Sequence, residues 1–282
     1  MINAGTRLLG LIGDPVSQSV SPAMHNAALQ ALGLDYAYLA FRVGAASLAA
    51  AVGGLRALDA AGFNVTIPHK ASILPLLDEL EPQASAIGAV NTVINRGGRL
   101  RGYNTDAAGF LAALKQHGVE PADKTIVLIG AGGVARAIAF ALVSHGADLI
   151  VLARRLPAAE ELGQHLGTEA GHIKALELNR MNLKKFLEEA DLLVNATSVG
   201  MTPDADRTPV PGDLLRPGLK VFDAVYHPQR TRLLCEAEAA GAATISGLPM
   251  LVAQAALSFE LWTGQKAPLE LMARAGQEAL AR

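Results

Sequence analysis

Gly130-Ala131-Gly132-Gly133-Val134-Ala135 is the stretch that decides the fold of this chain. It follows a predicted strand over residues 125–129 and precedes a predicted helix over about residues 133–144. The run satisfies the G-x-G-x-x-G/A pattern, whose glycines let the backbone turn tightly and approach a pyrophosphate at a helix N-terminus. Alone the pattern is weak, because a glycine turn made for close packing would also produce it. In its strand-turn-helix context it predicts a dinucleotide site formed by Gly130, Ala131, Gly132, Gly133 and Val134.

The next predicted strand, residues 148–152, ends without an acidic residue. A site for NAD usually has Asp or Glu at this point to bind the ribose 2′-hydroxyl. Arg154 and Arg155 follow instead, and guanidinium groups suit a 2′-phosphate, which a carboxylate would repel. The sequence therefore favours NADP over NAD, although an ordinary surface charge would explain either arginine alone.

Strands and helices alternate along most of the chain, which predicts an α/β protein with helices on both faces of its sheets. The length of 282 residues suits two domains. We expect residues 1–105 and 247–282 to form a substrate-binding and catalytic domain with a mostly parallel sheet. Residues 106–246 are expected to form a Rossmann-type NADP-binding domain, with a cleft between the two. In the first domain, helices are expected over residues 22–32, with Ser21 as the N-cap, and over about residues 71–80.

Composition limits the possible partners and compartments. The net charge of −2 gives no basic surface for nucleic acid or an anionic membrane. Cys235 is the single cysteine, which excludes an internal disulfide, and we expect it to be buried in a helix over residues 231–240. Seven histidines stand without metal-ligand spacing, so no metal is expected. With no signal peptide and no apolar run of about 18–20 residues, the expected location is the cytoplasm.

Asn64-Val65-Thr66-Ile67-Pro68-His69-Lys70 combines hydrogen-bonding groups with a cation. Apolar and polar residues alternate with the period of a strand, and Pro68 stops the pairing because it has no N–H. Asn64 and Thr66 then share one face near the strand end, and Lys70 follows. The segment is either an edge strand that runs into a solvated turn or one wall of a ligand site.

Other polar residues gather where predicted elements begin or end. Ser19 and Ser21 lie just before a helix, where hydroxyls beside unpaired N–H groups can bind a carboxylate. Asn91 and Asn104 each end a predicted strand, where ligands gather in open α/β sheets. Asp106 begins a helix, so it is either a surface acid stabilised by the helix dipole or the partner of a lysine.

Eight stretches in order along the chain resemble the shikimate dehydrogenase family closely, and together they cover nearly the whole chain. They are SQSVSPAMHN (17–26), NVTIPHK (64–70), GAVNT (88–92), GYNTD (102–106), GAGGVARA (130–137), NATSVGM (195–201), DAVYHP (223–228) and GLPMLVAQAALSFELWTG (247–264). The resemblance implies an oxidoreductase that reduces 3-dehydroshikimate to shikimate with NADPH, reversibly, in chorismate and aromatic amino acid biosynthesis.

The resemblance also implies a role for each matching residue. Lys70 and Asp106 match the catalytic pair. Substrate-binding positions of the family match Ser19 and Ser21 for the carboxylate, Asn64, Thr66, Asn91 and Gln254 for the ring hydroxyls, and Tyr226 near the substrate. Further cofactor contacts match Gly133, Val134, Thr197, Val225, Gly247 and Met250. The family commonly has Asn-Arg-Thr after the second strand, with another arginine three residues on. Here the residues are Ala153-Arg154-Arg155 and Ala158, so only Arg154 matches directly and Arg155 would replace the missing arginine.

Three other functions remain open. A quinate/shikimate dehydrogenase of the same family would use NAD or both cofactors. A non-catalytic sensor would bind the metabolite and regulate a partner, although intact Lys70 and Asp106 and the lack of an effector domain argue against it. A generic NADP-binding scaffold would not bind shikimate at all. Beyond the small-molecule substrate, the expected assembly is a monomer or a homodimer.

Overall fold

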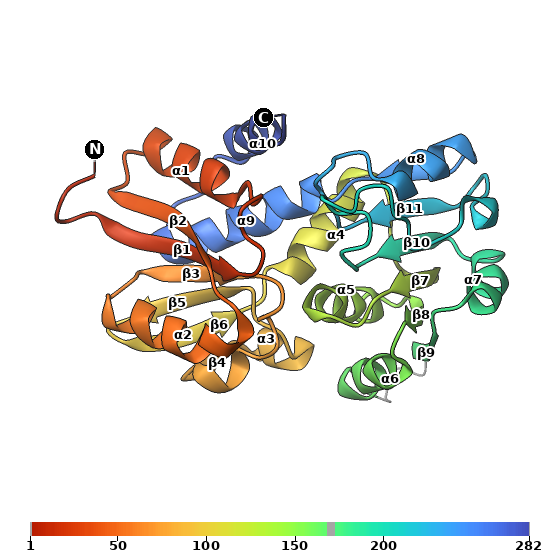
Figure 1. Ribbon diagram of the computed structural model, residues 1–282, viewed down its shortest axis with the longest axis horizontal. Coiled ribbons are helices and arrows are strands. Elements are labelled where there is room, and N and C mark those ends of the chain that lie inside the picture. The colour runs from red at the N-terminus through yellow and green to blue at the C-terminus, as the bar shows by residue number, and fades with distance from the viewer. Residues whose placement is uncertain (1, 168–172, 282) are drawn as a thin grey trace. The chain divides into compact units, whose positions relative to one another are not determined.

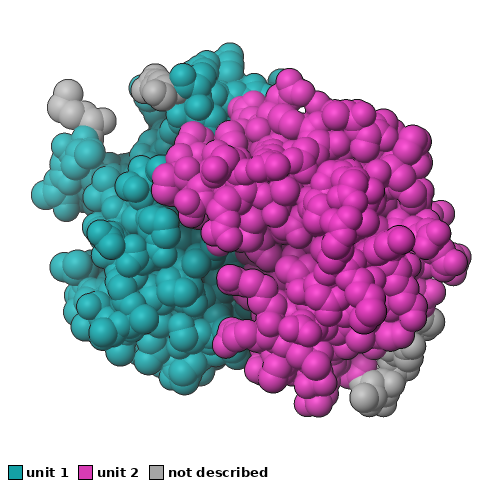
Figure 2. All heavy atoms as spheres, turned by 45° about the vertical axis from the view of Figure 1, so that its right-hand side comes forward, with its two compact units in different colours: residues 1–106, 252–282 teal, residues 107–251 magenta. Residues whose placement is uncertain are grey.

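The computed structural model describes residues 2–167 and 173–281 and divides the chain into two compact units. The first consists of residues 1–106 and 252–282 and the second of residues 107–251 (Figure 2). Each unit is built of helices around a six-stranded sheet (Figure 1). The predicted class, two α/β domains of which one is Rossmann-type, is confirmed.

The sheet of the first unit is mixed, with the strand order β2-β1-β3-β5-β6-β4. Its strands are β1 (Arg7–Gly13), β2 (Tyr36–Arg42), β3 (Gly62–Val65), β4 (Glu79–Leu80), β5 (Thr92–Arg96) and β6 (Arg99–Tyr103). β5 runs antiparallel to both of its neighbours, β3 and β6, and the other three pairs are parallel. The expectation of a mostly parallel sheet therefore holds, with β5 as the strand that reverses direction.

Helices cover both faces of this sheet. The helical segments of the unit are α1 (Ser21–Ala31), η1 (Ala45–Ser47), α2 (Leu48–Ala57), η2 (Leu74–Leu76), α3 (Pro82–Ile87), α10 (Leu269–Leu280) and, from Val252 onward, α9 (Leu248–Thr263). In Figure 1, α1 and α10 lie on one side of the sheet and α2 on the other. On the α2 side, Val52 and Leu55 pack with Phe63 and Val93 of the strands in one buried core.

The helix expected over residues 71–80 is wrong. The segment forms turns, the short 3₁₀ helix η2 and then β4. Pro75 explains the difference, because a proline inside an α-helix has no N–H to donate and clashes with the preceding turn. Sequence reasoning also missed α3, although Glu81 caps it by accepting from the Ala84 N–H at 3.2 Å and Gly88 ends it in the left-handed conformation.

The second unit has the parallel sheet of a Rossmann domain. Its order is β12-β11-β10-β7-β8-β9, with β7 (Thr125–Ile129), β8 (Asp148–Ala153), β9 (Ile173–Glu177), β10 (Leu192–Asn195), β11 (Lys220–Asp223) and β12 (Ala243–Ile245). All five pairs are parallel. The first strand of this unit, β7, therefore lies beside its fourth strand, β10, and the strand order reverses between them. That reversal is the switch point at which such sheets bind dinucleotides.

The helices of the second unit are α4 (Asp106–Gln116), whose first residue belongs to the first unit, α5 (Gly133–Val143), α6 (Leu156–His165), α7 (Arg180–Leu187) and α8 (Arg232–Ala239), with the 3₁₀ helix η3 (Gly212–Leu214). Cys235 on α8 is exposed, so its expected burial is wrong. α8 buries Leu233, Leu234 and Ala237, and the helical period places Cys235 on the opposite side. Within the described residues, no helix combines the length and the apolar character that crossing a membrane requires.

His25 of α1 lies in an aromatic cluster of the first unit. Its ring stacks on Tyr38 with centroids 4.4 Å apart, and the ring of Trp262 lies 5.3 Å away. His25 is fully buried, and neither ring nitrogen has a hydrogen-bond partner among the described residues. Burial without a partner disfavours the charged ring and lowers the pKa of His25 from 6.5 to about 3.

We expect His25 to make the first unit sensitive to acid. Below about pH 6.5 the unfolded chain binds a proton at this residue, and the folded chain binds it only near pH 3. The free energy of unfolding therefore falls as the pH falls through this window, by about 1.4 kcal/mol per pH unit from this group. His25→Phe, measured by urea unfolding at several pH values within the window, removes this part of the slope. The exposed control His117→Phe retains it, and an unchanged slope in His25→Phe would contradict the prediction.

Candidate active site

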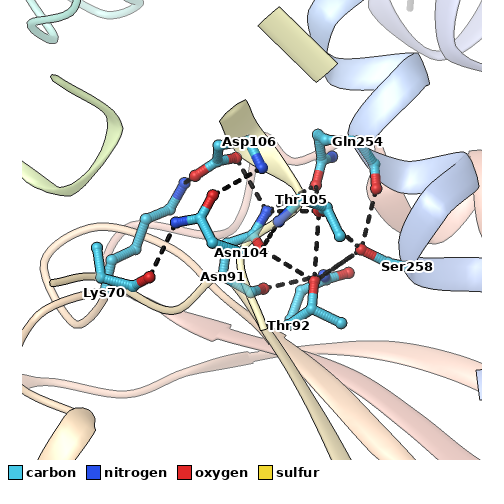
Figure 3. Close-up of polar contacts among 10 residues, drawn as sticks. Lys70, Asn91, Thr92, Asn104, Thr105, Asp106, Gln254 and Ser258 are labelled. Atoms are coloured by element: carbon cyan, nitrogen blue, oxygen red, sulfur yellow. Dashed lines mark hydrogen bonds and ion pairs between the residues drawn. The ribbon is translucent and has the colours of Figure 1, made fainter. Parts of the chain in front are cut away.

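Lys70 and Asp106 form a buried ion pair in the first unit (Figure 3). Lys70 Nζ lies 2.6 Å from Asp106 Oδ2, and the two residues are 8% and 4% exposed. Lys70 follows the turn after β3, and Asp106 is the first residue of α4. Since desolvation offsets most of the attraction within a buried pair, such a pair is weak evidence of a stabilising role. A role in chemistry accounts for it better.

The turn that carries Lys70 is fixed by contacts on both sides. His69 Nε2 lies 2.6 Å from the Val43 carbonyl oxygen, and His69 is buried. The Lys70 carbonyl accepts from the Val90 N–H at 2.7 Å. These contacts hold the backbone before and at Lys70, so its ammonium group has a defined place.

Asn91 orients the second oxygen of Asp106. Asn91 Oδ1 accepts from the backbone N–H of Thr105 at 2.8 Å, and this donor decides which way the amide points. Asn91 Nδ2 therefore faces Asp106 Oδ1 at 2.9 Å and Gln254 Oε1 at 3.1 Å. Asp106 is thus held by Lys70 at one oxygen and by Asn91 at the other.

Asn64 joins the same hydrogen-bonded group from β3. Its Nδ2 donates to the Asn91 carbonyl at 3.0 Å, and its Oδ1 accepts from the Tyr38 hydroxyl at 2.7 Å. The structure therefore brings together five of the residues expected in the site. They are Asn64, Lys70, Asn91, Asp106 and Gln254.

The other residues of the first unit that were expected to bind the substrate lie outside this hydrogen-bonded group. Ser21 is the first residue of α1 and not its N-cap, which is Val20, so that expectation is wrong. Ser19 Oγ accepts from the Ser21 N–H at 3.3 Å and takes over part of the capping. Thr66 lies just after β3, where its N–H donates to the Ile12 carbonyl at 2.9 Å.

Three buried hydroxyls of the group were not singled out from the sequence. Thr92, Thr105 and Ser258 all hydrogen-bond within it. The sequence did carry a signal for Ser258, because it follows Gln254 by four residues and so shares its face of α9. Thr92 and Thr105 are chain neighbours of Asn91 and Asp106, but nothing in the sequence separates them from ordinary strand and helix-start threonines.

The glycine turn of the second unit fits a dinucleotide. Gly130 follows β7 with φ +114°, a conformation that side chains strongly disfavour. A Cβ at Gly130 would lie 3.1 Å from Thr197 Cγ2 and 3.2 Å from the Ala196 oxygen, so a side chain would crowd the loop after β10. α5 starts at Gly133 and presents its N-terminal N–H groups at the switch point.

Asp223 holds the loops that carry two of the predicted cofactor residues. Its Oδ1 accepts from Asn195 Nδ2 at 2.9 Å and from the Val225 N–H at 3.0 Å, and its Oδ2 accepts from Thr231 Oγ1 at 2.6 Å. Asn195 Oδ1 in turn accepts from the Thr197 N–H at 3.0 Å. Burial raises the pKa of Asp223 to about 6, against the effect of its three donors. Sequence reasoning missed this carboxylate, although a charged residue that ends a buried strand is a recognisable signal.

The other cofactor candidates also lie in the second unit. Arg154 and Arg155 are exposed after β8, and Arg155 is the N-cap of α6. Tyr226 is half-buried in the segment after β11, and Val225, Gly247 and Met250 are buried.

A Rossmann sheet with a glycine turn at its switch point, in a chain that also holds a buried lysine-carboxylate pair among amides, defines a dinucleotide-dependent oxidoreductase. Three family descriptions match successive parts of the chain. The shikimate dehydrogenase substrate binding domain matches residues 11–93, shikimate / quinate 5-dehydrogenase matches residues 112–202, and the shikimate 5'-dehydrogenase C-terminal domain matches residues 247–275.

Known proteins agree over nearly the full length. A shikimate dehydrogenase (NADP(+)) of Methanopyrus kandleri is 50% identical over an alignment of 283 positions, which covers 99% of this chain and 98% of the relative. A crystal structure of shikimate dehydrogenase with NADP+ superposes with a TM-score of 0.91 at 41% identity, covering 100% of this chain and 98% of the other. The enzyme of Thermus thermophilus, crystallised with NADP(H) and shikimate, gives a TM-score of 0.85 at 41% identity over 97% of this chain and 99% of the other. The chain belongs to the shikimate dehydrogenase family.

Proposed function

We propose that the chain catalyses the reversible reduction of 3-dehydroshikimate to shikimate with NADPH, in chorismate and aromatic amino acid biosynthesis. The observation that carries this proposal is the buried Lys70–Asp106 pair at 2.6 Å, with the amides of Asn64, Asn91 and Gln254 in the same hydrogen-bonded group. Amides can both donate to and accept from ring hydroxyls, which suits a polyhydroxylated substrate. The cofactor supplies the hydride when it is bound.

Lys70 acts on the oxygen of the ketone. Negative charge grows on that oxygen as the carbonyl is reduced, and an ammonium group beside it stabilises the transition state and can donate a proton. Asp106 orients the ammonium group through Oδ2, and Asn91 keeps the carboxylate in place through Oδ1. In the reverse direction Lys70 starts as the amine that remains after the forward proton transfer, and this amine accepts the proton of the substrate hydroxyl.

We assign most of the substrate-binding residues to the first unit and the NADP-binding residues to the second. In the first unit, Ser19 and Ser21 bind the substrate carboxylate, and the ring hydroxyls are bound by Asn64, Thr66, Asn91 and Gln254. Tyr226 contributes to substrate binding from the segment after β11. The second unit binds NADP through Gly130, Ala131, Gly132, Gly133, Val134, Arg154, Arg155, Thr197, Val225, Gly247 and Met250. The glycine turn supports this assignment, because the close approach of Thr197 to Gly130 leaves no room for a side chain there.

Initial rates measured with shikimate and quinate, each against NADP and NAD, test the proposal. We expect the highest kcat/KM for shikimate with NADP. A higher value for quinate with NAD would assign the chain to the quinate branch of the family. Binding of shikimate without turnover would instead favour a sensor, and the absence of both binding and turnover would leave a cofactor-binding scaffold.

Arg154 is expected to set the preference for NADP. Arg154→Ala removes a guanidinium group from the proposed 2′-phosphate site, and a charge-assisted hydrogen bond contributes about 1.5–3 kcal/mol, or roughly 10- to 100-fold in affinity. The KM for NADP should rise by this factor while the KM for NAD stays within about twofold, and Arg155→Ala should have the smaller effect. Arg230→Ala, an exposed arginine paired with Glu238, is the control. Equal changes for the two cofactors in Arg154→Ala would contradict this role.

The proposal also covers compartment and assembly. We infer a cytoplasmic enzyme, because a single exposed cysteine suits a reducing compartment. It works as a monomer or a homodimer, which light scattering of the purified protein distinguishes.

A further inference from the structure

Three buried hydroxyls meet at the centre of the first unit's polar group (Figure 3). Thr92 begins β5, Thr105 precedes α4, and Ser258 lies on α9. Ser258 Oγ is 2.7 Å from Thr92 Oγ1 and 3.2 Å from Thr105 Oγ1, and the two threonine oxygens are 3.5 Å apart. All three residues are at most 4% exposed. We call Thr92, Thr105 and Ser258 the hydroxyl trio.

The trio touches each amide that is proposed to bind the ring hydroxyls. Asn64 Nδ2 reaches Thr92 Oγ1 at 3.1 Å and Ser258 Oγ at 3.2 Å. Asn91 accepts from Thr92 Oγ1 at 3.0 Å and donates to Thr105 Oγ1 at 2.8 Å. These amides come from β3 and from the residue before β5, so the trio joins two separate segments of the chain.

Gln254 contacts two members of the trio, Ser258 on its own helix and Thr105 before α4. Ser258 Oγ donates to the backbone carbonyl of Gln254 at 3.0 Å. Thr105 Oγ1 lies 3.4 Å from the side-chain oxygen of Gln254, Oε1. Asn91 Nδ2 approaches the same Oε1 at 3.1 Å, so the side-chain oxygen of Gln254 faces the trio and Asn91. The orientation of the Gln254 side chain therefore depends on the orientation of the Asn91 side chain.

The hydrogen count couples the orientations of the three hydroxyls. Each hydroxyl has one hydrogen, yet every member of the trio lies within hydrogen-bond distance of several oxygens. Each hydroxyl must therefore accept from one neighbour while it donates to another. Removing one hydroxyl takes one partner from each of its neighbours and changes which of the remaining groups donate, so the amides around it must turn to recover their hydrogen bonds.

We propose that the hydroxyl trio is a positioning device for the shikimate reaction, in which Thr92, Thr105 and Ser258 set the orientation of Asn64, Asn91 and Gln254 without acting on the reacting atoms. Through Asn91, which donates to Asp106 Oδ1 at 2.9 Å, the same device extends to the catalytic pair. This inference rests on the proposed function.

Matched substitutions distinguish the effect of losing a hydroxyl from the effect of changing the shape of the side chain. Thr92→Val keeps the volume and removes the hydroxyl, whereas Thr92→Ser keeps the hydroxyl and removes the methyl group. Thr105→Val and Thr105→Ser form a second pair, and Ser258→Ala removes the third hydroxyl. Thr263→Val is the control, because Thr263 Oγ1 also donates to a carbonyl four residues earlier on α9, at 2.8 Å, but is not part of the trio.

We expect each variant that lacks a hydroxyl to lower kcat/KM for shikimate by about 10- to 100-fold, through both a lower kcat and a higher KM, because small displacements of positioning groups have effects of this size. The KM for NADP should stay within about twofold. The serine variants should recover most of the loss, Thr263→Val should match the wild type, and Thr92→Val/Ser258→Ala should lose less than the product of its single losses.

Three results would overturn the proposal. The first is an equal loss of kcat/KM in the serine and the valine variants, because the shape of the side chain and not its hydroxyl would then matter. The others are wild-type kcat/KM in Ser258→Ala, and equal increases in the KM for NADP and for shikimate. Shikimate affinity measured by calorimetry keeps the two proposals distinguishable. A wild-type protein that neither binds nor turns over shikimate ends the proposed function, whereas an active wild type with unaffected hydroxyl variants ends this inference alone.

Discussion

Lys70→Ala is expected to lower kcat for shikimate oxidation by about three orders of magnitude while the KM for shikimate stays within a few-fold. The substitution removes the cation beside the reacting oxygen, and loss of such electrostatic stabilisation costs about 10²–10³ in rate even without a proton-transfer role. The amide side chains of Asn64 and Gln254, which are proposed to bind the substrate, remain in Lys70→Ala. Binding of the substrate in the ground state is therefore largely retained. A loss confined to kcat is the signature of an interaction made only in the transition state.

Steady-state kinetics with saturating NADP measure this effect, together with circular dichroism to check the fold. Lys115→Ala changes an exposed lysine of α4 and should behave as the wild type. A kcat within about threefold of the wild type in Lys70→Ala would remove Lys70 from the mechanism. A large increase in KM at unchanged kcat would make it a binding residue only.

Gly62→Ala is expected to have the largest effect on stability. Gly62 begins β3, and a Cβ there would lie 2.3 Å from Trp262 Nε1 and 2.5 Å from the Val93 oxygen. These two atoms form a hydrogen bond of 2.9 Å that ties α9 to the sheet. The added methyl group must displace the indole, so overpacking of about 1–3 kcal/mol adds to the loss of a buried hydrogen bond of similar size.

A loss of this size should lower the melting temperature by about 10 °C, at roughly 2–4 °C for each kcal/mol. The matched control is Gly53→Ala in α2, where no neighbouring atom lies within 4 Å of the new methyl group. Alanine is favoured over glycine in a helix by about 1 kcal/mol, so this variant should melt at or above the wild-type temperature. Equal melting temperatures for the two variants would show that the space around Gly62 does not limit packing.

Local patterns were sufficient to predict most of the second unit. The run from β7 through the glycine turn into α5 follows from apolar periodicity and the special conformation of Gly130, both of which are properties of neighbouring residues. β9 was not predicted, because its alternating residues are only half-buried and give a weak pattern. The exposure of Cys235 depends on which side of α8 faces the sheet, and a single residue type cannot show this.

The sequence predicted the types of residue in the candidate site better than the hydrogen bonds that join them. The motifs indicated Lys70, Asp106 and the amides, but the hydroxyl trio arises from residues more than 150 positions apart, such as Thr92 and Ser258. Threonine and serine have no strong preference for burial, so only the folded arrangement reveals that their hydroxyls are shared. Pro75 shows the opposite case, because a single local residue was sufficient to exclude a helix and was overlooked.

The first unit is assembled from two distant parts of the chain, and this has a consequence for synthesis on the ribosome. Residues 107–251 form their unit from one continuous segment, which can fold as soon as it has emerged. The N-terminal 106 residues must wait for α9, because Trp262 bonds to Val93 and Gln254 to Asn91 across the whole intervening segment. The proposed substrate site can therefore form only after the continuous unit has been made, and a nascent chain that ends before residue 252 cannot contain it.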